Sequence, residues 1–137
     1  MTDESKRYIY AGLRIGEHDT AVVTITERAD DGREFVRQLQ PTKSKSACGL
    51  DWGVRGSFTR ELAYSLLLHH YQNAGLSDYE ERAEAWYKSV ADIAFSRLPP
   101  QGWKMDSDYI DEVLRVLDAQ TRTSPQVDPR STVSLGG

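Results

Sequence analysis

The sequence predicts an α+β domain in which a three-stranded antiparallel meander is followed by three helices packed on one face. Two observations carry this prediction. Residues 8–40 alternate in polarity with the period of two that is typical of strands, whereas residues 58–119 repeat apolar side chains at helical spacing. A glycine-containing junction, residues 50–57, joins the two halves. Strands followed by helices, instead of alternating with them, favour an α+β fold.

The composition fits one domain and narrows the classes of function. The 137 residues can bury one core, and they divide into a flexible start at 1–6, a single domain at 7–119 and a flexible tail at 120–137. No segment has the roughly 18 apolar residues of a membrane helix, and the first residues lack a signal-peptide pattern, so we expect a cytoplasmic protein. The single cysteine, Cys48, excludes an internal disulfide, and we expect no cofactor and no metal.

Three strands are expected in the first forty residues. The first, residues 8–15, is expected to bury one apolar face, formed by Ile9, Ala11, Leu13 and Ile15. The second, residues 20–26, is rich in β-branched residues, which favour strands. The turn at 30–32 ends in glycine and leads into a third strand that stops at Pro41, because proline donates no amide hydrogen.

Three helices are expected after the junction. Residues 58–73 carry an apolar stripe and stop near Gly75. Asp78 followed by Glu81 resembles a capping box that begins a second helix, which Pro99 ends. Asp106 is expected to cap a third helix, with its stripe at Ile110, Val113, Leu114 and Leu117.

Two adjacent histidines, His69 and His70, lie inside the first predicted helix. Neighbouring residues point about 100° apart on a helix, so the two side chains do not readily bind one metal ion from the same face. We expect one histidine to pack against the core and the other to face solvent.

The junction contains residues with special packing or backbone needs. We interpret Trp52 as a core anchor, together with Trp86 and Trp103, and Gly53 and Gly56 as residues that permit turns. An alternative is anion binding, since a helix that begins near Ser57 exposes unpaired amides beside Arg55 and Arg60. The motifs that would specify a nucleotide phosphate site are absent from the sequence.

Charge is unevenly distributed along the chain. The formal net charge is −4, but residues 33–60 hold six cations and two acids, which gives this segment +4 and the remainder −8. An acidic protein is not typical of bulk nucleic-acid binding. The basic segment is nevertheless the candidate surface for a partner or an anion, and its candidate residues are Arg37, Lys43, Lys45, Arg55, Ser57 and Arg60.

Three features occur together in this sequence: the order of strands, the run Leu50-x-Trp52-Gly53-x-x-Gly56-Ser57-x-x-x-x-Leu62-Ala63, and the later Leu98-Pro99 and Gly102-Trp103. In these features the chain resembles an uncharacterised-domain family of small phage, plasmid and microbial proteins. The resemblance covers residues 8–117 and implies a core of the form W-G-Y-G-G-S-G-P-A-x-L-A. The chain departs from that core at Val54, Arg55, Phe58 and Thr59. The resemblance implies a fold and a mobile-element context, but no reaction.

The function that these observations favour is non-enzymatic binding of a protein partner, as an accessory factor encoded by a mobile element and acting on a host defence complex. Charge asymmetry supports it because charged surfaces steer encounter. One alternative is a small nucleic-acid-binding module that uses the basic segment on phosphates and aromatic residues on bases. Another is a Cys/His enzyme built from Cys48 and His69 or His70.

Overall fold

The computed structural model describes residues 8–46 and 49–123. The predicted flexible start at 1–6, residues 124–137 of the predicted tail, and Cys48 lie outside these ranges. The last helix continues to Thr123, four residues beyond the predicted domain end at residue 119.

The predicted α+β class is confirmed, but the sheet has four strands instead of three. The strands are β1 (Tyr8–Ile15), β2 (Thr20–Arg28), β3 (Glu34–Gln38) and β4 (Gly102–Asp106). They pair antiparallel in the order β3-β2-β1-β4. The fourth strand was missed because it is a five-residue element between Pro100 and a helix. Its alternation places Trp103 and Met105 in the core.

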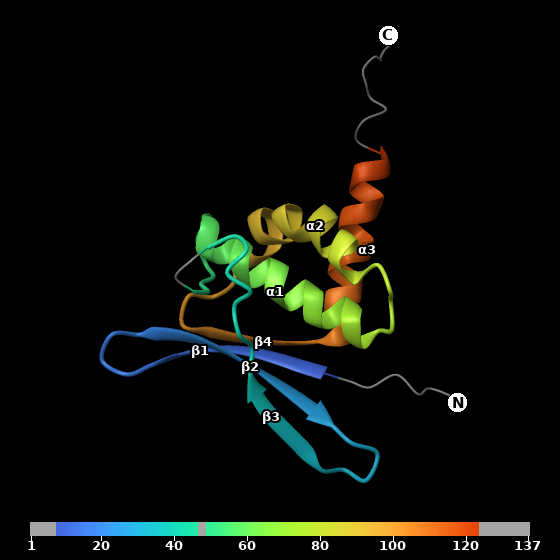
Figure 1. The fold of residues 1–137 in the computed structure, drawn as a ribbon. Helices are drawn as coiled ribbons and strands as arrows, with labels where there is room; N and C mark the ends of the chain where they lie inside the picture. The colour runs from blue at the N-terminus through green and yellow to red at the C-terminus, as the bar shows by residue number, and fades with distance from the viewer. Residues whose placement is uncertain (1–7, 47–48, 124–137) are drawn as a thin grey trace.

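Helices cover one face of the sheet (Figure 1). They are α1 (Ser57–Asn73), α2 (Tyr79–Ser89) and α3 (Ser107–Thr123). The second predicted helix changes form after Ser89 into a π-helical turn, η1 (Val90–Ala94), and a 3₁₀ turn, η2 (Phe95–Arg97). Within the described ranges, no helix combines the length and apolar character needed to cross a bilayer.

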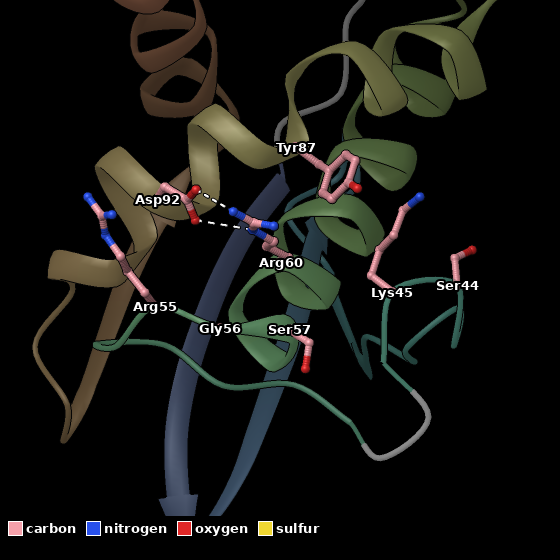
Figure 2. Close-up of a pocket in the computed structure, with 8 residues that line it drawn as sticks. All are labelled: Ser44, Lys45, Arg55, Gly56, Ser57, Arg60, Tyr87 and Asp92. Carbon is pink, nitrogen blue, oxygen red and sulfur yellow. Dashed lines mark hydrogen bonds and ion pairs between the residues drawn. The ribbon is translucent and has the colours of Figure 1, made fainter.

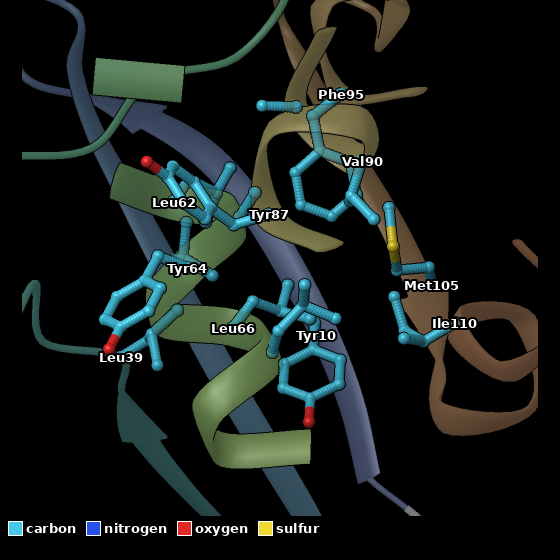
Figure 3. Packing of buried hydrophobic residues seen from close by; sticks show 14 of the residues in the cluster. Tyr10, Leu39, Leu62, Tyr64, Leu66, Tyr87, Val90, Phe95, Met105 and Ile110 are labelled. Carbon is cyan, nitrogen blue, oxygen red and sulfur yellow. The ribbon is translucent and has the colours of Figure 1, made fainter. Parts of the chain in front are cut away.

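The core lies between the sheet and the helices (Figure 3). Val23 and Ile25 of β2 meet Leu62 and Leu66 of α1 in one cluster of buried residues, to which Phe95 also belongs. This cluster includes the stripe expected on the first helix. Burial of such side chains contributes roughly 1.5 to 3 kcal/mol each.

The face predicted for the first strand is inverted. Tyr8 and Tyr10 are buried under the helices, whereas Leu13 and Ile15, expected in the core, are 37% and 48% exposed on the other face. The tyrosines can be buried because their hydroxyl groups have partners there: Tyr8 donates to Asn73 Oδ1 at 2.8 Å, and Tyr10 contacts a histidine. A buried tyrosine with a hydrogen-bonded hydroxyl offers more apolar area than isoleucine.

Two capping predictions have different outcomes. Asp106 caps α3 as expected, since its Oδ1 accepts a hydrogen bond from the Tyr109 amide at 2.8 Å. The capping box at Asp78 is wrong, because α2 has no side-chain cap there. The Asp78 carboxylate instead accepts a hydrogen bond at 2.8 Å from Nε of Arg82, which lies one helical turn later.

Candidate functional site

A pocket of about 600 Å³ lies where α1 begins. Its wall is formed by the loop before α1, the basic loop at 42–46, and parts of α2 and η1 (Figure 2). Four residues from the predicted partner-binding set line it: Lys45, Arg55, Ser57 and Arg60. The other lining residues are Ser44, Gly56, Tyr87 and Asp92. The structure therefore gathers residues that are up to 48 positions apart in the sequence, from Ser44 to Asp92.

Lys45 is partly buried, and its ammonium has partners within the chain. Its ammonium lies 3.0 Å from both carboxylate oxygens of Glu84, and 4.7 and 4.5 Å from the ring centroids of Tyr64 and Tyr87. Burial opposes the charged form, but the hydrogen bond from Lys45 to Glu84 and the further interactions with Tyr87 and Glu84 together raise the pKa of the ammonium. Lys45 thus fastens the basic loop to α1 and α2, and it is not free to bind a partner by itself.

Arg60 is also paired. Its Nε and Nη2 donate to the two oxygens of Asp92 at 3.3 and 2.7 Å, which is the bidentate arrangement of a guanidinium on a carboxylate. The hydrogen bond from Arg60 lowers the pKa of Asp92, which stays ionised. This pair joins α1 to the π-helical turn η1. Such turns are rare and often occur at functional sites.

Arg55 differs from the other two cations. It is exposed, and its side chain makes no hydrogen bond or ion pair with the described part of the chain. Figure 2 shows Arg55 and Arg60 on either side of Asp92. Arg55 lowers the pKa of Asp92 only through its charge, after the larger effects of Arg60 and of burial. Arg55 is therefore the cation of this pocket that can form a new ion pair at least cost.

Ser57 is the first residue of α1. Gly56 precedes it, and among the described residues no side chain caps the amides of the first turn, which contains no acidic residue. The positive end of the helix dipole is consequently left without a local anion. Arg55 and this helix end lie together on the rim of the pocket.

The basic loop is positioned by Glu61, a residue that the sequence analysis missed. Its side chain is completely buried, and its carboxylate accepts main-chain hydrogen bonds from Thr42, Lys43, Lys45 and Ser46 at 2.7 to 3.0 Å. Two hydroxyl groups, Thr42 Oγ1 and Ser65 Oγ, also donate to it. Burial alone would raise the pKa of this carboxyl group, but the hydrogen bonds together lower it. Glu61 is thus an ionised anchor around which the loop folds.

The junction before α1 is fixed by packing. Trp52 is 1% exposed, lies edge-on to Trp103 with ring centroids 5.6 Å apart, and donates its Nε1 hydrogen to Pro100 O at 3.1 Å. Gly53 has a φ of +80°, and a Cβ there would lie 3.1 Å from Leu98 O. These contacts fix the path of the chain that presents Arg55. Trp86 is partly buried against the same core.

Two residues of the predicted surface lie elsewhere. Lys43 does not line the pocket; it has a φ of +66° and contributes its amide to Glu61. Arg37 lies on β3, and its Nη2 is 2.9 Å from His69 Nε2. Sequence proximity grouped these residues with the others, but the loop and the strand separate them.

The expectation for the two histidines is wrong, because both are buried. His69 uses both ring nitrogens: Nε2 faces Arg37, and Nδ1 is 2.8 Å from the Tyr10 hydroxyl oxygen. His70 Nε2 lies 2.7 Å from Asp111 Oδ1 and joins α1 to α3. Within residues 8–46 and 49–123, no cluster of His, Cys, Asp or Glu is arranged to hold a metal ion.

Fold and pocket together define a small α+β domain with a polar pocket where its first helix begins. The chain belongs to a family of unknown function, DUF6166, whose family model matches residues 10–116. This confirms that the chain belongs to an uncharacterised-domain family. No curated protein and no solved structure matches the chain.

Proposed function

We propose that this protein is a non-enzymatic binding protein that docks on an acidic surface of another protein. The contact surface is the rim of the pocket, with Arg55 at its centre. The observation that carries the proposal is the gathering of Arg55, the uncapped start of α1, and the paired cations Lys45 and Arg60 around one pocket. An acidic side chain placed there gains from the charge of Arg55 and from the helix dipole.

Apolar groups beside Arg55 favour a protein over a small anion as the partner. Val54 and Phe58, which flank Arg55 and Ser57 in the sequence, are 54% and 40% exposed. Arginine and aromatic residues are enriched in the centres of protein interfaces. A partner that covers Val54 and Phe58 would therefore bury apolar area in addition to pairing its acid with Arg55.

Nucleic-acid binding is the alternative function. It has less support than protein binding because most of the basic residues already have partners within the chain. Four of the six cations in the basic segment have partners within the chain: Arg33 with Asp31, Arg37 with His69, Lys45 with Glu84, and Arg60 with Asp92. Phosphate binding would compete with these contacts. The third reading, a Cys/His enzyme, depends on Cys48, which lies outside the described residues.

The biological context is a finer part of the proposal. An accessory factor of a mobile element that acts on a host defence complex would use such a binding surface without catalysis. This context is supported by the sequence resemblance, whereas the family match carries no function. It is tested by the identity of the partner.

The test is an affinity pull-down with the tagged protein from a lysate of the source organism, with and without nuclease. It is repeated with Arg55→Glu and with Arg115→Glu, which makes the same change of charge at an exposed position on α3. We expect a protein partner that survives nuclease, is lost with Arg55→Glu and is retained with Arg115→Glu. Binding of the purified partner should then weaken at least about tenfold with Arg55→Glu, which corresponds to one lost ion pair at an interface.

Stability measurements separate docking from folding. Arg55→Glu should change the free energy of unfolding by no more than about 0.5 kcal/mol, as an exposed charge usually does. Trp52→Ala should cost about 3 to 5 kcal/mol because the ring is buried. Equal losses from both substitutions, or a partner that Arg55→Glu leaves bound, would contradict the assigned surface. Recovery of nucleic acid, with proteins that vanish after nuclease, would favour the alternative.

A further inference from the structure

β3 is an outer strand of the sheet, and none of its residues lines the pocket. Among the residues that the structure describes, it pairs only with β2, and all five of its residues are exposed. Figure 1 shows β3 below the helical layer, where no helix runs along its outer side. One long edge of this strand is therefore accessible to another strand.

The ladder between β2 and β3 shows which main-chain groups face outward. The Ala29 amide donates to Arg33 O, and the Leu39 amide donates to Val23 O, both at 2.8 Å. In an antiparallel pair, hydrogen-bonded positions alternate, so Phe35 and Arg37 also bond to β2. The amides and carbonyls of Glu34, Val36 and Gln38 point to the free edge.

The two outer strands of the sheet differ in how their edges are protected. β4 has Lys104 at its centre and follows Pro99 and Pro100, and both lysine and proline discourage pairing with another chain. β3 is also flanked by a proline, Pro41, but it has no lysine and it exposes Phe35 and Val36 at 52% and 64%. Its charges also have partners within the chain, because Glu34 accepts from Arg28 and Arg37 contacts His69.

The sequence of β3 is complementary to itself in one register. When two copies run antiparallel about a twofold axis at Val36, Glu34 lies opposite Gln38, and Phe35 lies opposite Arg37 of the second copy. No like charges lie directly opposite each other in this register, because Arg37 keeps its contact with His69 and faces an uncharged ring. Shifting the axis to Phe35 places Arg33 opposite Arg37, and shifting it to Arg37 places that residue opposite itself. Like charges directly opposite each other are destabilising, so the register at Val36 is favoured.

We propose that β3 is a self-association edge, through which two copies of this chain pair antiparallel about a twofold axis at Val36. The outward groups of Glu34, Val36 and Gln38 then form about six main-chain hydrogen bonds between the copies. Two four-stranded sheets become one continuous sheet. A single strand pair buries less than the roughly 1,000 Å² of a stable interface. The dimer is therefore weak, with a dissociation constant in the micromolar range or higher.

Sedimentation equilibrium on the full chain, from about 10 µM to about 1 mM, tests the dimer. Val36→Pro removes one outward amide and no bond to β2, and proline is tolerated on edge strands. We expect the dissociation constant to rise at least about tenfold. Val36→Lys keeps the amide but places two like charges at the axis, and it should have the same effect. Val116→Lys, at an exposed apolar residue of α3, is the matched control and should leave the dimer unchanged.

Disulfide cross-linking tests the register, in a Cys48→Ser background. Facing residues of a hydrogen-bonded pair have Cα atoms about 5.5 Å apart, within the range for a disulfide. We expect Val36→Cys to cross-link two copies. Gln38→Cys alone should not, because its two copies lie about 14 Å apart in this register, whereas a mixture of Glu34→Cys and Gln38→Cys should cross-link.

Three results would overturn the proposal. They are a monomer throughout the concentration range, a dimer that both Val36→Pro and Val36→Lys leave intact, and cross-linking at position 38 that equals cross-linking at position 36. Arg55→Glu should not affect the dimer, since Arg55 lies on the pocket and not on β3. The dimer and the docking surface therefore succeed or fail independently.

Discussion

The two halves of α1 each bury a polar side chain, and one of these side chains is ionised whereas the other is neutral. Glu61, near the beginning of the helix, is ionised and accepts hydrogen bonds from a loop. His69, near the end, is neutral: burial, together with the smaller effects of the charges of Arg37 and His70, lowers its pKa to about 4. One helix thus stabilises a charge at one position and suppresses it at another.

The difference comes from the partners. Main-chain amides and hydroxyl groups surround Glu61, and these donors stabilise a carboxylate. Arg37 can only donate, so Nε2 of His69 must accept, and the ring proton lies on Nδ1, which donates to the Tyr10 oxygen. A second proton on His69 would be placed against a guanidinium. The charge of a buried group on this helix is therefore decided by the strand or loop that packs on it.

The largest effect is expected for Glu61→Ala. It removes the acceptor of several main-chain amides at once, so we expect a loss of about 3 kcal/mol or more in the free energy of unfolding. The loop at 42–46 should also become accessible to proteases. Glu84→Ala, at a carboxylate that is 56% exposed, is the matched control. It should cost about 1 kcal/mol or less.

Chemical denaturation of both variants measures these losses. Equal losses for Glu61→Ala and Glu84→Ala would contradict the role of Glu61 as an anchor. Glu61→Gln should lie between the wild type and Glu61→Ala, because an amide keeps one acceptor oxygen.

The buried groups in the two halves of α1 should respond to acid in different pH ranges. The folded pKa of His69, about 4, is below the ordinary value of 6.5, so the unfolded state binds more protons between these values. Stability should therefore fall as the pH drops from 6.5 to 4, by about 3 kcal/mol at most. Arg37 of β3, His70 of α1 and Glu27 of β2 act on this group through their charges.

The carboxylate of Glu61 should respond at lower pH. Its folded pKa lies below 4.5, so the stability that it contributes is present above this pH and is lost as the pH falls through the folded pKa. Stability measured against pH for His69→Phe should lack the slope between pH 6.5 and 4. A wild-type curve that is flat in this interval would show that His69 is not held neutral.

A smaller effect is expected for Tyr10→Phe. The change leaves the Nδ1 hydrogen of His69 buried without an acceptor, which costs about 1 to 3 kcal/mol. Tyr8→Phe removes a hydroxyl group from the neighbouring inward position of the same strand, where it bonds to Asn73 in a partly buried site. Tyr8→Phe should cost less, about 1 kcal/mol. The reverse order in thermal denaturation would contradict the assigned contact between Tyr10 and His69.

The smallest effect is expected for Lys45→Met. The substitution keeps the apolar stem but removes the ion pair with Glu84 and the contacts with two tyrosine rings, for a loss of about 1 kcal/mol. High salt should reduce the difference from the wild type, since the pair is partly exposed. A loss as large as that of Glu61→Ala would mean that the lysine, and not the glutamate, anchors the loop.

Periodicity predicted most of the fold because it reports burial directly. The strands at 8–15 and 20–26 and the helix at 58–73 lie within one or two residues of their observed ends. The more apolar face of β1 is not its inward face, and what decided this was a hydroxyl partner for Tyr10 on a helix some sixty positions later. β4 could have been found from the alternation of Trp103 and Met105.

The candidate site was predictable in composition but not in electrostatics. The sequence places cations in one segment, and the fold brings Lys45, Arg55 and Arg60 to one pocket. The sequence does not show that Glu84 of α2 pairs with Lys45, or that Asp92 of η1 pairs with Arg60. The signal for Glu61 was weak: an acid and Ser65 at a spacing of four residues, beside an apolar stripe.

The π-helical turn at Val90–Ala94 makes this region sensitive to chain length. Such a turn accommodates one residue more than an α-helix does over the same rise, and each residue added or removed rotates the rest of the helix by about 100°. Deleting one residue here would restore a regular helix and turn Asp92 away from Arg60. An insertion or deletion at this turn would therefore change the shape of the pocket more than most substitutions of its lining.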